Sequence, residues 1–195
     1  MLNKKEFDKH SVLDRFNHQL QTSGIQTSNT LNPNFNWAST DISEIKKHYN
    51  LKKYILLFPF CSPHLSIKKW PYFNDLSKLI LDKFNDEFKI VTAPGPLEIN
   101  EEKNINSLAL LDNGKALDIS QLTALIKESS FIIANDTGPA HIAAHVGAKG
   151  LTLFGQHTTA YKVSIERENF KVIQVNDLKN LSPEKVFERV IENLH

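Results

Sequence analysis

The sequence predicts an α/β protein in which a doubly wound, mostly parallel sheet is covered by helices on both faces. Short apolar runs alternate with amphipathic segments of helical period from about residue 50 to the C-terminus, and turn or cap residues separate most of them. The length of 195 residues, 41% of them hydrophobic, suits one domain of ordinary size with an appendage.

The first 45 residues predict a helix and a linker that precede this domain. Apolar residues recur at roughly helical spacing within residues 6–22, and Gly24 is a typical stop signal. Residues 26–40 are polar and rich in turn formers. We therefore expect the chain to divide into residues 1–45 and a folded domain of residues 46–195.

The remaining elements alternate along the chain. Asp41 or Ser43 would cap a short helix that ends near residue 49, Ser120 would cap a later helix, and Ser182 would cap the last. The expected strands are residues 54–59, 88–94, 131–135, 150–154 and 171–175. The other expected helices are residues 72–84, 120–129, 139–146 and 182–194.

Composition argues against several classes of protein. The net charge of +1 gives no electrostatic case for binding nucleic acid or an anionic membrane. The one cysteine, Cys61, cannot build a disulfide framework or a cysteine-based zinc site, and we expect its thiol to be buried and inert. Residues 1–16 lack the apolar core of a signal peptide, and no apolar run approaches the roughly 20 residues of a membrane span. We expect a cytoplasmic protein.

Polar residues follow three of the predicted strands, at the edge where parallel sheets bind their ligands. The first segment is PFCSPHLSIKKWP (59–71), the second is APGPLE (93–98) and the third is NDTGPAH (135–141). We expect the three loops to meet in one crevice. The candidate binding residues that they carry are Ser62, Ser66, Lys68, Glu98, Asp136, Thr137, Gly138 and His141.

The third loop has the features of an anion site. Asp136 leaves the strand, the Thr137 side chain would accept from a backbone N–H one turn on, and Gly138 lets another group approach the backbone. Pro139 suits an early helical position. The result is a helix N-terminus suited to phosphate, although a well-capped turn without a ligand has the same pattern.

Each of the other candidates has a functional and a structural interpretation. Lys68 or Lys69 could reach a phosphate as a point charge, or the two could be a solvated pair. Glu98 could accept from ribose hydroxyls or be a surface acid. His141 lies within the candidate anion site and is equally compatible with a structural role. With His145 it has an i, i+4 spacing, but no third ligand is evident, so we expect no metal.

The ordered set of motifs resembles the C-terminal half of glycosyltransferase family 9, the ADP-heptose:lipopolysaccharide heptosyltransferases. The motifs of that family are, in chain order, approximately P-G-A-S, K-R-W-P, G-G-x-x-E, D-T-G-P-x-H-L-A-A-x-x-G and F-G. This chain has PFCS, KKWP, PGPLE, DTGPAHIAAHVG and LFG in the same order over about residues 50–160. The sequence departs from the pattern at Phe60, which replaces the glycine of the first motif, and in a gap about one residue longer before KKWP.

The resemblance implies a Rossmann-like, nucleotide-sugar-binding domain from an enzyme of the GT-B arrangement, with no cofactor and no metal. Lys68 would neutralise the diphosphate and, with Asp136, take part in catalysis. Glu98 would hold the ribose, and Asp136, Thr137, Gly138 and His141 would line the sugar-diphosphate pocket. Ser62 and Ser66 are weaker candidates for phosphate contacts, and the longer gap leaves the register between Lys68 and Lys69 open.

The resemblance also implies partners. The donor would be a nucleotide-diphosphate sugar, ADP-heptose by analogy, and the acceptor a lipopolysaccharide-type molecule, which would be the one route to peripheral membrane association. Residues 1–45 resemble the end of an N-terminal acceptor domain, so a separate chain would supply that half, and the uncovered face would favour self-association. The alternative is a nucleotide-sugar-binding module without turnover, or a remnant of a split gene.

Overall fold

The computed structural model describes residues 4–85 and 87–194. Within these ranges the strands form a six-stranded sheet in the order β3-β2-β1-β4-β5-β6, and all the pairings between its strands are parallel. The strands are β1 (Tyr54–Phe58), β2 (Lys89–Thr92), β3 (Leu108–Ala109), β4 (Phe131–Asn135), β5 (Gly150–Phe154) and β6 (Phe170–Gln174). The expected doubly wound α/β fold is confirmed.

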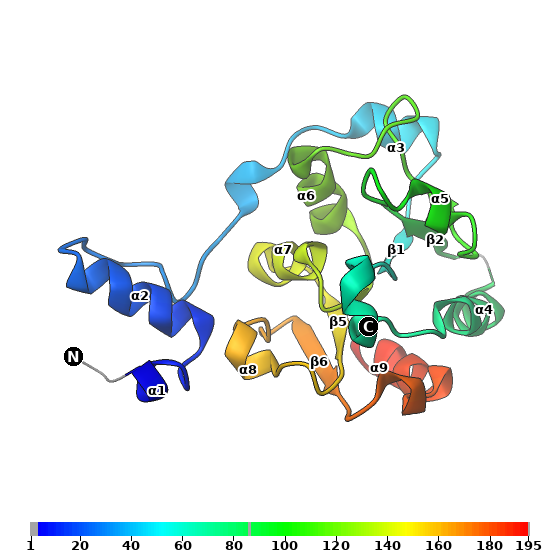
Figure 1. Cartoon of the computed structure of the whole chain (residues 1–195). Coiled ribbons are helices and arrows are strands. Elements are labelled where there is room, and N and C mark those ends of the chain that lie inside the picture. The colour runs from blue at the N-terminus through cyan, green and yellow to red at the C-terminus, as the bar shows by residue number, and fades with distance from the viewer. Residues whose placement is uncertain (1–3, 86, 195) are drawn as a thin grey trace.

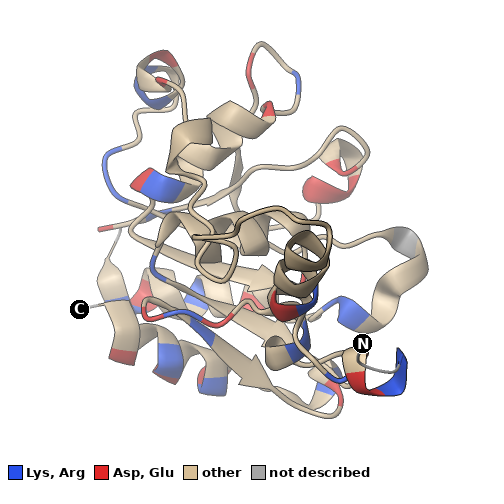
Figure 2. Cartoon of the chain, turned by 90° about the vertical axis from the view of Figure 1, so that its left-hand side faces the viewer, with Lys and Arg blue, Asp and Glu red and all other residues tan. Residues whose placement is uncertain are grey.

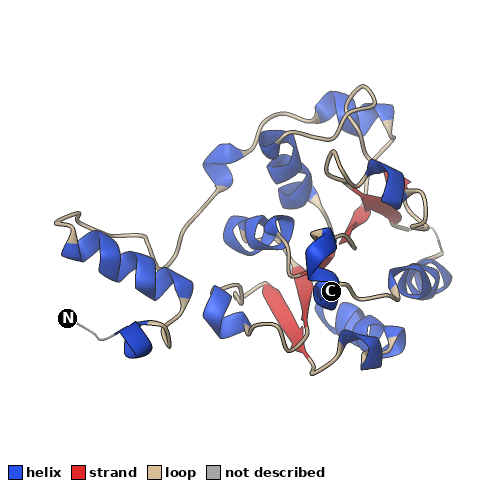
Figure 3. Ribbon diagram, in the orientation of Figure 1, coloured by secondary structure: helices blue, strands red, loops and turns tan. Residues whose placement is uncertain are grey.

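Helices cover both faces of the sheet, with α3, α6 and α7 on one face and α4 and α9 on the other (Figures 1 and 3). The helices before β2 are α1 (Lys4–Phe7), α2 (Val12–Thr22), η1 (Asn36–Ala38), α3 (Ser43–His48), η2 (Pro63–Lys68) and α4 (Phe73–Phe84). Those after it are α5 (Ile99–Glu102), α6 (Ile119–Glu128), α7 (Gly138–Val146), α8 (Ala160–Val163), η3 (Leu178–Asn180) and α9 (Pro183–Leu194).

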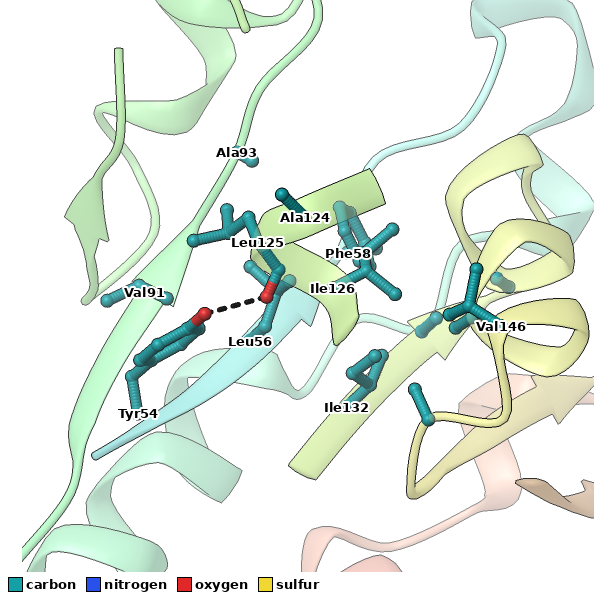
Figure 4. Close-up of a cluster of buried hydrophobic side chains, with 14 of the residues drawn as sticks. Tyr54, Leu56, Phe58, Val91, Ala93, Ala124, Leu125, Ile126, Ile132 and Val146 are labelled. Carbon is teal, nitrogen blue, oxygen red and sulfur yellow. Dashed lines mark hydrogen bonds between the residues drawn. The ribbon is translucent and has the colours of Figure 1, made fainter. Parts of the chain in front are cut away.

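The two faces of β1 supply two separate cores. Successive side chains of a strand point to opposite faces, so Leu56 joins the cluster under α6 and α7 while Leu57 joins the cluster under α4 and α9. Figure 4 shows the first cluster, where the Tyr54 hydroxyl donates to the Leu125 carbonyl (2.7 Å) at the end of an otherwise apolar interface. Burial on both faces explains why β1, β4 and β5 are nearly continuous apolar runs.

The N-terminal segment differs from its prediction. The expected helix over residues 6–22 is broken into α1 and α2, because Ser11 caps α2 by accepting from the Asp14 backbone N–H (3.3 Å). The two helices stand away from the sheet (Figure 1), and α2 lies beside α8, where Leu13 N donates to Ser164 Oγ (3.4 Å). The predicted division at residues 45 and 46 falls inside α3, whose Ile45 is part of the core.

Two predicted caps are also wrong. Asp118, not Ser120, caps α6, since its carboxylate accepts from Gln121 N (2.8 Å) while the Gln121 side chain accepts from Asp118 N (3.0 Å). Ile42 occupies the N-cap of α3, and the Asp41 carboxylate accepts from Ser43 instead. The observed starts of α3 and α6 differ from the predicted ones because a carboxylate side chain accepts from backbone N–H groups at the start of each helix.

Candidate functional site

The site lies at the carboxyl edge of the sheet, between β1 and β4. The chain runs from β1 outward to β3 and from β4 outward to β6, so the loops after β1 and β4 part in opposite directions. Such a switch point leaves a crevice in which doubly wound sheets bind ligands. The loop after β1 contains η2, and the loop after β4 leads directly into α7.

Asn135, the last residue of β4, fixes both ends of the loop after β1. Its buried amide donates to the Pro59 carbonyl (2.8 Å) and accepts from the Trp70 backbone N–H (3.1 Å). The indole of Trp70 is buried and donates to the Leu181 carbonyl (2.8 Å). These bonds hold the segment that carries Lys68, a role of Asn135 that the sequence analysis did not identify. The sequence feature that indicates this role is an amide residue at the end of an apolar strand, because a buried amide requires hydrogen-bond partners.

Asp136 is the centre of the site and is 4% exposed. Its Oδ2 accepts from Lys68 Nζ (2.7 Å) and lies 3.0 Å from His157 Nε2, while its Oδ1 lies 3.3 Å from His141 Nε2. Burial by itself would raise the pKa of this carboxyl, but the hydrogen bonds from His141, Lys68 and His157 outweigh burial and hold the pKa far below its usual range. Asp136 is therefore ionised at neutral pH.

The ionised carboxylate determines the tautomers of the two histidines. A carboxylate without a proton can only accept, so Nε2 of His141 and Nε2 of His157 each carry a hydrogen. The Asp136 charge thus accepts from three donors in different segments, which are Lys68 in η2, His141 in α7 and His157 in the loop after β5. His157, which comes from the loop after β5, was not among the predicted site residues, because no motif singled it out.

The N-terminus of α7 adjoins this carboxylate. Gly138 is the first helical residue, and no atom lies within 4 Å of the position that a Cβ would occupy there. The first-turn N–H groups have no intrahelical partners, and they face this space with the positive end of the helix dipole. Thr137 holds the N-cap position, but its hydroxyl donates to the Asn135 carbonyl (3.3 Å) and caps no N–H, contrary to prediction.

The two adjacent lysines contact different acids. Lys68 pairs with Asp136, whereas Lys69 pairs with Glu101 in α5. Glu98, at the N-cap position of α5, accepts from the Gly95 backbone N–H through Oε2 (2.8 Å). The loops after β1 and β2 therefore meet, as expected, and it is Lys68 that reaches the centre of the site.

The predicted serines lie farther from this centre. Ser62 and Ser66 are exposed, and Ser66 lines a neighbouring cleft of about 390 Å³ with Lys69 and Gln156. The Cys61 thiol is half-buried, contacts the Leu65 carbonyl (3.5 Å) and has a pKa raised by its burial, so it is a poor nucleophile.

His145 takes no part in the site. It is buried on another face of α7, where its Nδ1 lies 3.4 Å from Arg167 Nη2 and its ring packs edge-on against Phe35. Among residues 4–85 and 87–194, no group of three or more His, Cys, Asp or Glu side chains is arranged to hold a metal ion. In the same ranges, no helix has the length and apolar character needed to cross a bilayer.

Charge on the surface is mixed. Figure 2 shows Lys and Arg interspersed with Asp and Glu along the ribbon, in keeping with the net charge of +1. Attraction for an anion must therefore come from local groups. At this site those groups are Lys68, the two histidines and the start of α7.

Three solved structures share the fold. E. coli ADP-heptose LPS heptosyltransferase II is 18% identical, with a TM-score of 0.64 over 87% of this chain and 53% of its own. E. coli heptosyltransferase WaaC, solved with ADP, is 18% identical, with a TM-score of 0.63 over 89% of this chain and 53% of its own. A glycosyl transferase family 9 protein from Veillonella parvula is 16% identical, with a TM-score of 0.72 over 95% and 60%.

This chain thus spans between about half and three fifths of the length of those relatives. Comparison with curated protein sequences gave no significant match. The model of glycosyltransferase family 9 (heptosyltransferase) matches residues 2–191, which is nearly the whole chain. On that match, supported by the fold and by the ordered motifs at the carboxyl edge of the sheet, the chain belongs to glycosyltransferase family 9.

Proposed function

We propose that this chain binds the diphosphate of a nucleotide-activated sugar and serves as the donor-binding half of a glycosyltransferase. The observation that carries the proposal is the convergence of Lys68 and His141 on Asp136 at the open N-terminus of α7. A cation, ring N–H groups and free backbone N–H groups at one place are suited to phosphate oxygens. The solved relatives include one with ADP and one with ADP-2-deoxy-2-fluoro heptose, which supports ADP-heptose as donor.

The transfer reaction would use these groups on the leaving side. A hydroxyl of the acceptor attacks the anomeric carbon of the sugar, and the bond from that carbon to the β-phosphate oxygen breaks. The electron pair and the new negative charge go to the nucleoside diphosphate. Lys68 and the α7 N–H groups would stabilise this charge without a metal, and Asp136 would keep Lys68 at the site until the donor binds. The acceptor proton would go to a base in the acceptor half.

Glu98 is the proposed ribose ligand. Its Oε2 accepts from the Gly95 N–H, and that bond positions the carboxylate in the loop between β2 and α5. A carboxylate in this place can accept from the ribose hydroxyls of a nucleotide whose phosphates lie near Lys68. Ser62 and Ser66 are exposed, Ser66 lines the cleft, and both remain proposed contacts to outer phosphate oxygens.

The partners of the chain are part of the proposal. The chain spans 53% of the two E. coli structures, and the proposal includes a partner chain that supplies the acceptor half and binds the lipopolysaccharide-type acceptor. The N-terminal segment exposes apolar side chains, such as Phe16 (53%) and Trp37 (82%), that such a half or a second copy could cover. A cytoplasmic location is likewise proposed.

The test is a calorimetric titration with ADP of the wild type, Lys68→Ala and Lys69→Ala. We expect Lys68→Ala to weaken binding by about 1–3 kcal/mol, or roughly 5- to 150-fold, because a charge-assisted contact to the diphosphate is lost. Lys69→Ala is the matched control, since its ammonium faces Glu101, and we expect less than about a 2-fold change. Equal affinities of wild type and Lys68→Ala would contradict the proposal.

The alternative function is a binding module without turnover, in which the same groups bind the diphosphate but no sugar is transferred. One measurement distinguishes the two functions. Release of ADP from ADP-heptose by the purified chain, with or without an acceptor, indicates an enzyme. Tight binding of ADP-heptose with no release indicates the module.

A further inference from the structure

His157 lies outside every motif that led to the proposed function. It follows the LFG segment by two residues and enters the site from the loop after β5. Its ring stacks on Phe154, with centroids 5.7 Å apart and an interplanar angle of 11°. Its Nε2 lies 3.0 Å from Asp136 Oδ2, and its side chain is 8% exposed.

The partners of Asp136 differ in their freedom to move. The Lys68 side chain is 21% exposed and the His141 side chain 33% exposed, so both are accessible to solvent. His157 is by contrast held by burial and by stacking. A ligand can therefore draw Lys68 and His141 toward itself, whereas His157 has little room to turn.

Among the described residues, the second ring nitrogen of His157 forms no contact that competes with the bond to Asp136. Its Nδ1 is buried and has no hydrogen-bond partner in the part of the chain that the structure describes. A buried polar atom without a partner costs free energy, and the compensating contact of this ring is the bond from Nε2 to the carboxylate. Direct contact between Nδ1 and a diphosphate would require the ring to leave its place.

Binding of a diphosphate makes this bond important. When Lys68 turns to the phosphates, Asp136 loses its shortest hydrogen bond (2.7 Å) while a second negative charge arrives nearby. A buried carboxylate without hydrogen-bond donors has a high free energy. If the Asp136 carboxylate were free to move, it would repel the phosphates or pair with Lys68 again. A rigid donor on Oδ2 prevents both outcomes.

We infer that His157 is a positioning residue of the donor site, which holds the Asp136 carboxylate in place while Lys68 and His141 engage the diphosphate. This inference rests on the proposed function. It assigns to the loop after β5 a part in donor binding, through Asp136 and without contact to the ligand.

The test is a titration with ADP of two variants that separate the ring from its N–H. His157→Phe keeps a ring that stacks on Phe154 and removes the donor, so we expect about 5- to 10-fold weaker binding. His157→Gln restores an N–H donor at a similar reach, and we expect an affinity within about 2-fold of wild type. His48→Phe changes an exposed histidine in α3 and is the matched control.

A double-mutant cycle then shows whether His157 acts through Asp136. In an Asp136→Asn background, His157→Phe should change the affinity for ADP by less than about 2-fold, because the carboxylate that the ring positions is gone. Thermal unfolding of each variant identifies any that fails to fold. Nitrogen NMR of the wild-type imidazoles provides an independent measurement, and we expect hydrogen on Nε2 of His157.

The outcomes distinguish the two proposals. No ADP binding by the wild type would overturn the proposed function and, with it, this inference. ADP binding that is unchanged in His157→Phe, or weakened equally in the Phe and Gln variants, would overturn the inference alone. The same holds if the effect of His157→Phe persists in the Asp136→Asn background, or if NMR finds hydrogen on Nδ1 alone.

Discussion

Replacing Asn135 with alanine removes the side chain that joins both ends of the loop carrying Lys68. Two hydrogen bonds are lost, the one to the Pro59 carbonyl (2.8 Å) and the one from the Trp70 N–H (3.1 Å). Both backbone groups belong to buried residues, so water does not replace the amide without rearrangement. A buried group left without its partner costs about 1–3 kcal/mol, so the expected loss of unfolding free energy is roughly 2–5 kcal/mol.

That loss is a large fraction of the stability of an ordinary domain, about 5–15 kcal/mol. Urea unfolding followed by circular dichroism measures it, and Asn180→Ala, at an exposed position in η3, is the control that should change stability by less than about 0.5 kcal/mol. We also expect weaker ADP binding by the folded fraction, because Lys68 is no longer held. A loss below about 1 kcal/mol in Asn135→Ala would refute the assigned role of the amide.

Two other predictions concern α7. Gly138→Ala should leave the unfolding free energy unchanged or slightly higher, because no neighbouring atom lies within 4 Å of the new Cβ. The same methyl group should fill the space for phosphate and weaken ADP binding about 10-fold. An unchanged affinity in the titration would show that the ligand does not approach this residue. Burial, then Arg167 and His141, lower the pKa of His145 from 6.5 to about 4, so between these values the unfolded chain binds a proton that the folded chain does not. The unfolding free energy should therefore decrease from pH 6.5 to pH 4 by up to about 3 kcal/mol more in wild type than in His145→Gln. Urea unfolding at several pH values measures this difference. Equal slopes of unfolding free energy against pH in the two proteins would contradict the prediction.

The elements with strong periodicity were predictable, and the short ones were not. The predicted bounds of β4 and β5 agree with the structure, since each is an apolar run between turn residues. β3 has two residues, and α5 and α8 have four each, too few to show a period. The break between α1 and α2 was missed because the apolar pattern continues across Ser11, whereas a local side-chain bond decides the start of α2.

The site divides in the same way. The meeting of Lys68 and Asp136 followed from the sequence, because parallel strands bring the residues after their carboxyl ends to one edge. The Thr137 hydroxyl was assigned the wrong partner, since the carbonyl of Asn135 competes for it. The roles of Asn135 and His157 depend on contacts across loops that no local pattern records.

The sequence by itself determined the fold class, the edge of the sheet where the site lies and most residues that form it, because those follow from periodicity and from residue types at strand ends. The tertiary structure decided which of two adjacent lysines reaches Asp136, which two histidines contact that carboxylate and which amide bonds to both ends of the loop after β1. The reason is physical. Hydrophobic period is a local property that a few residues express, whereas the satisfaction of a buried charge or amide depends on groups brought together from distant parts of the chain.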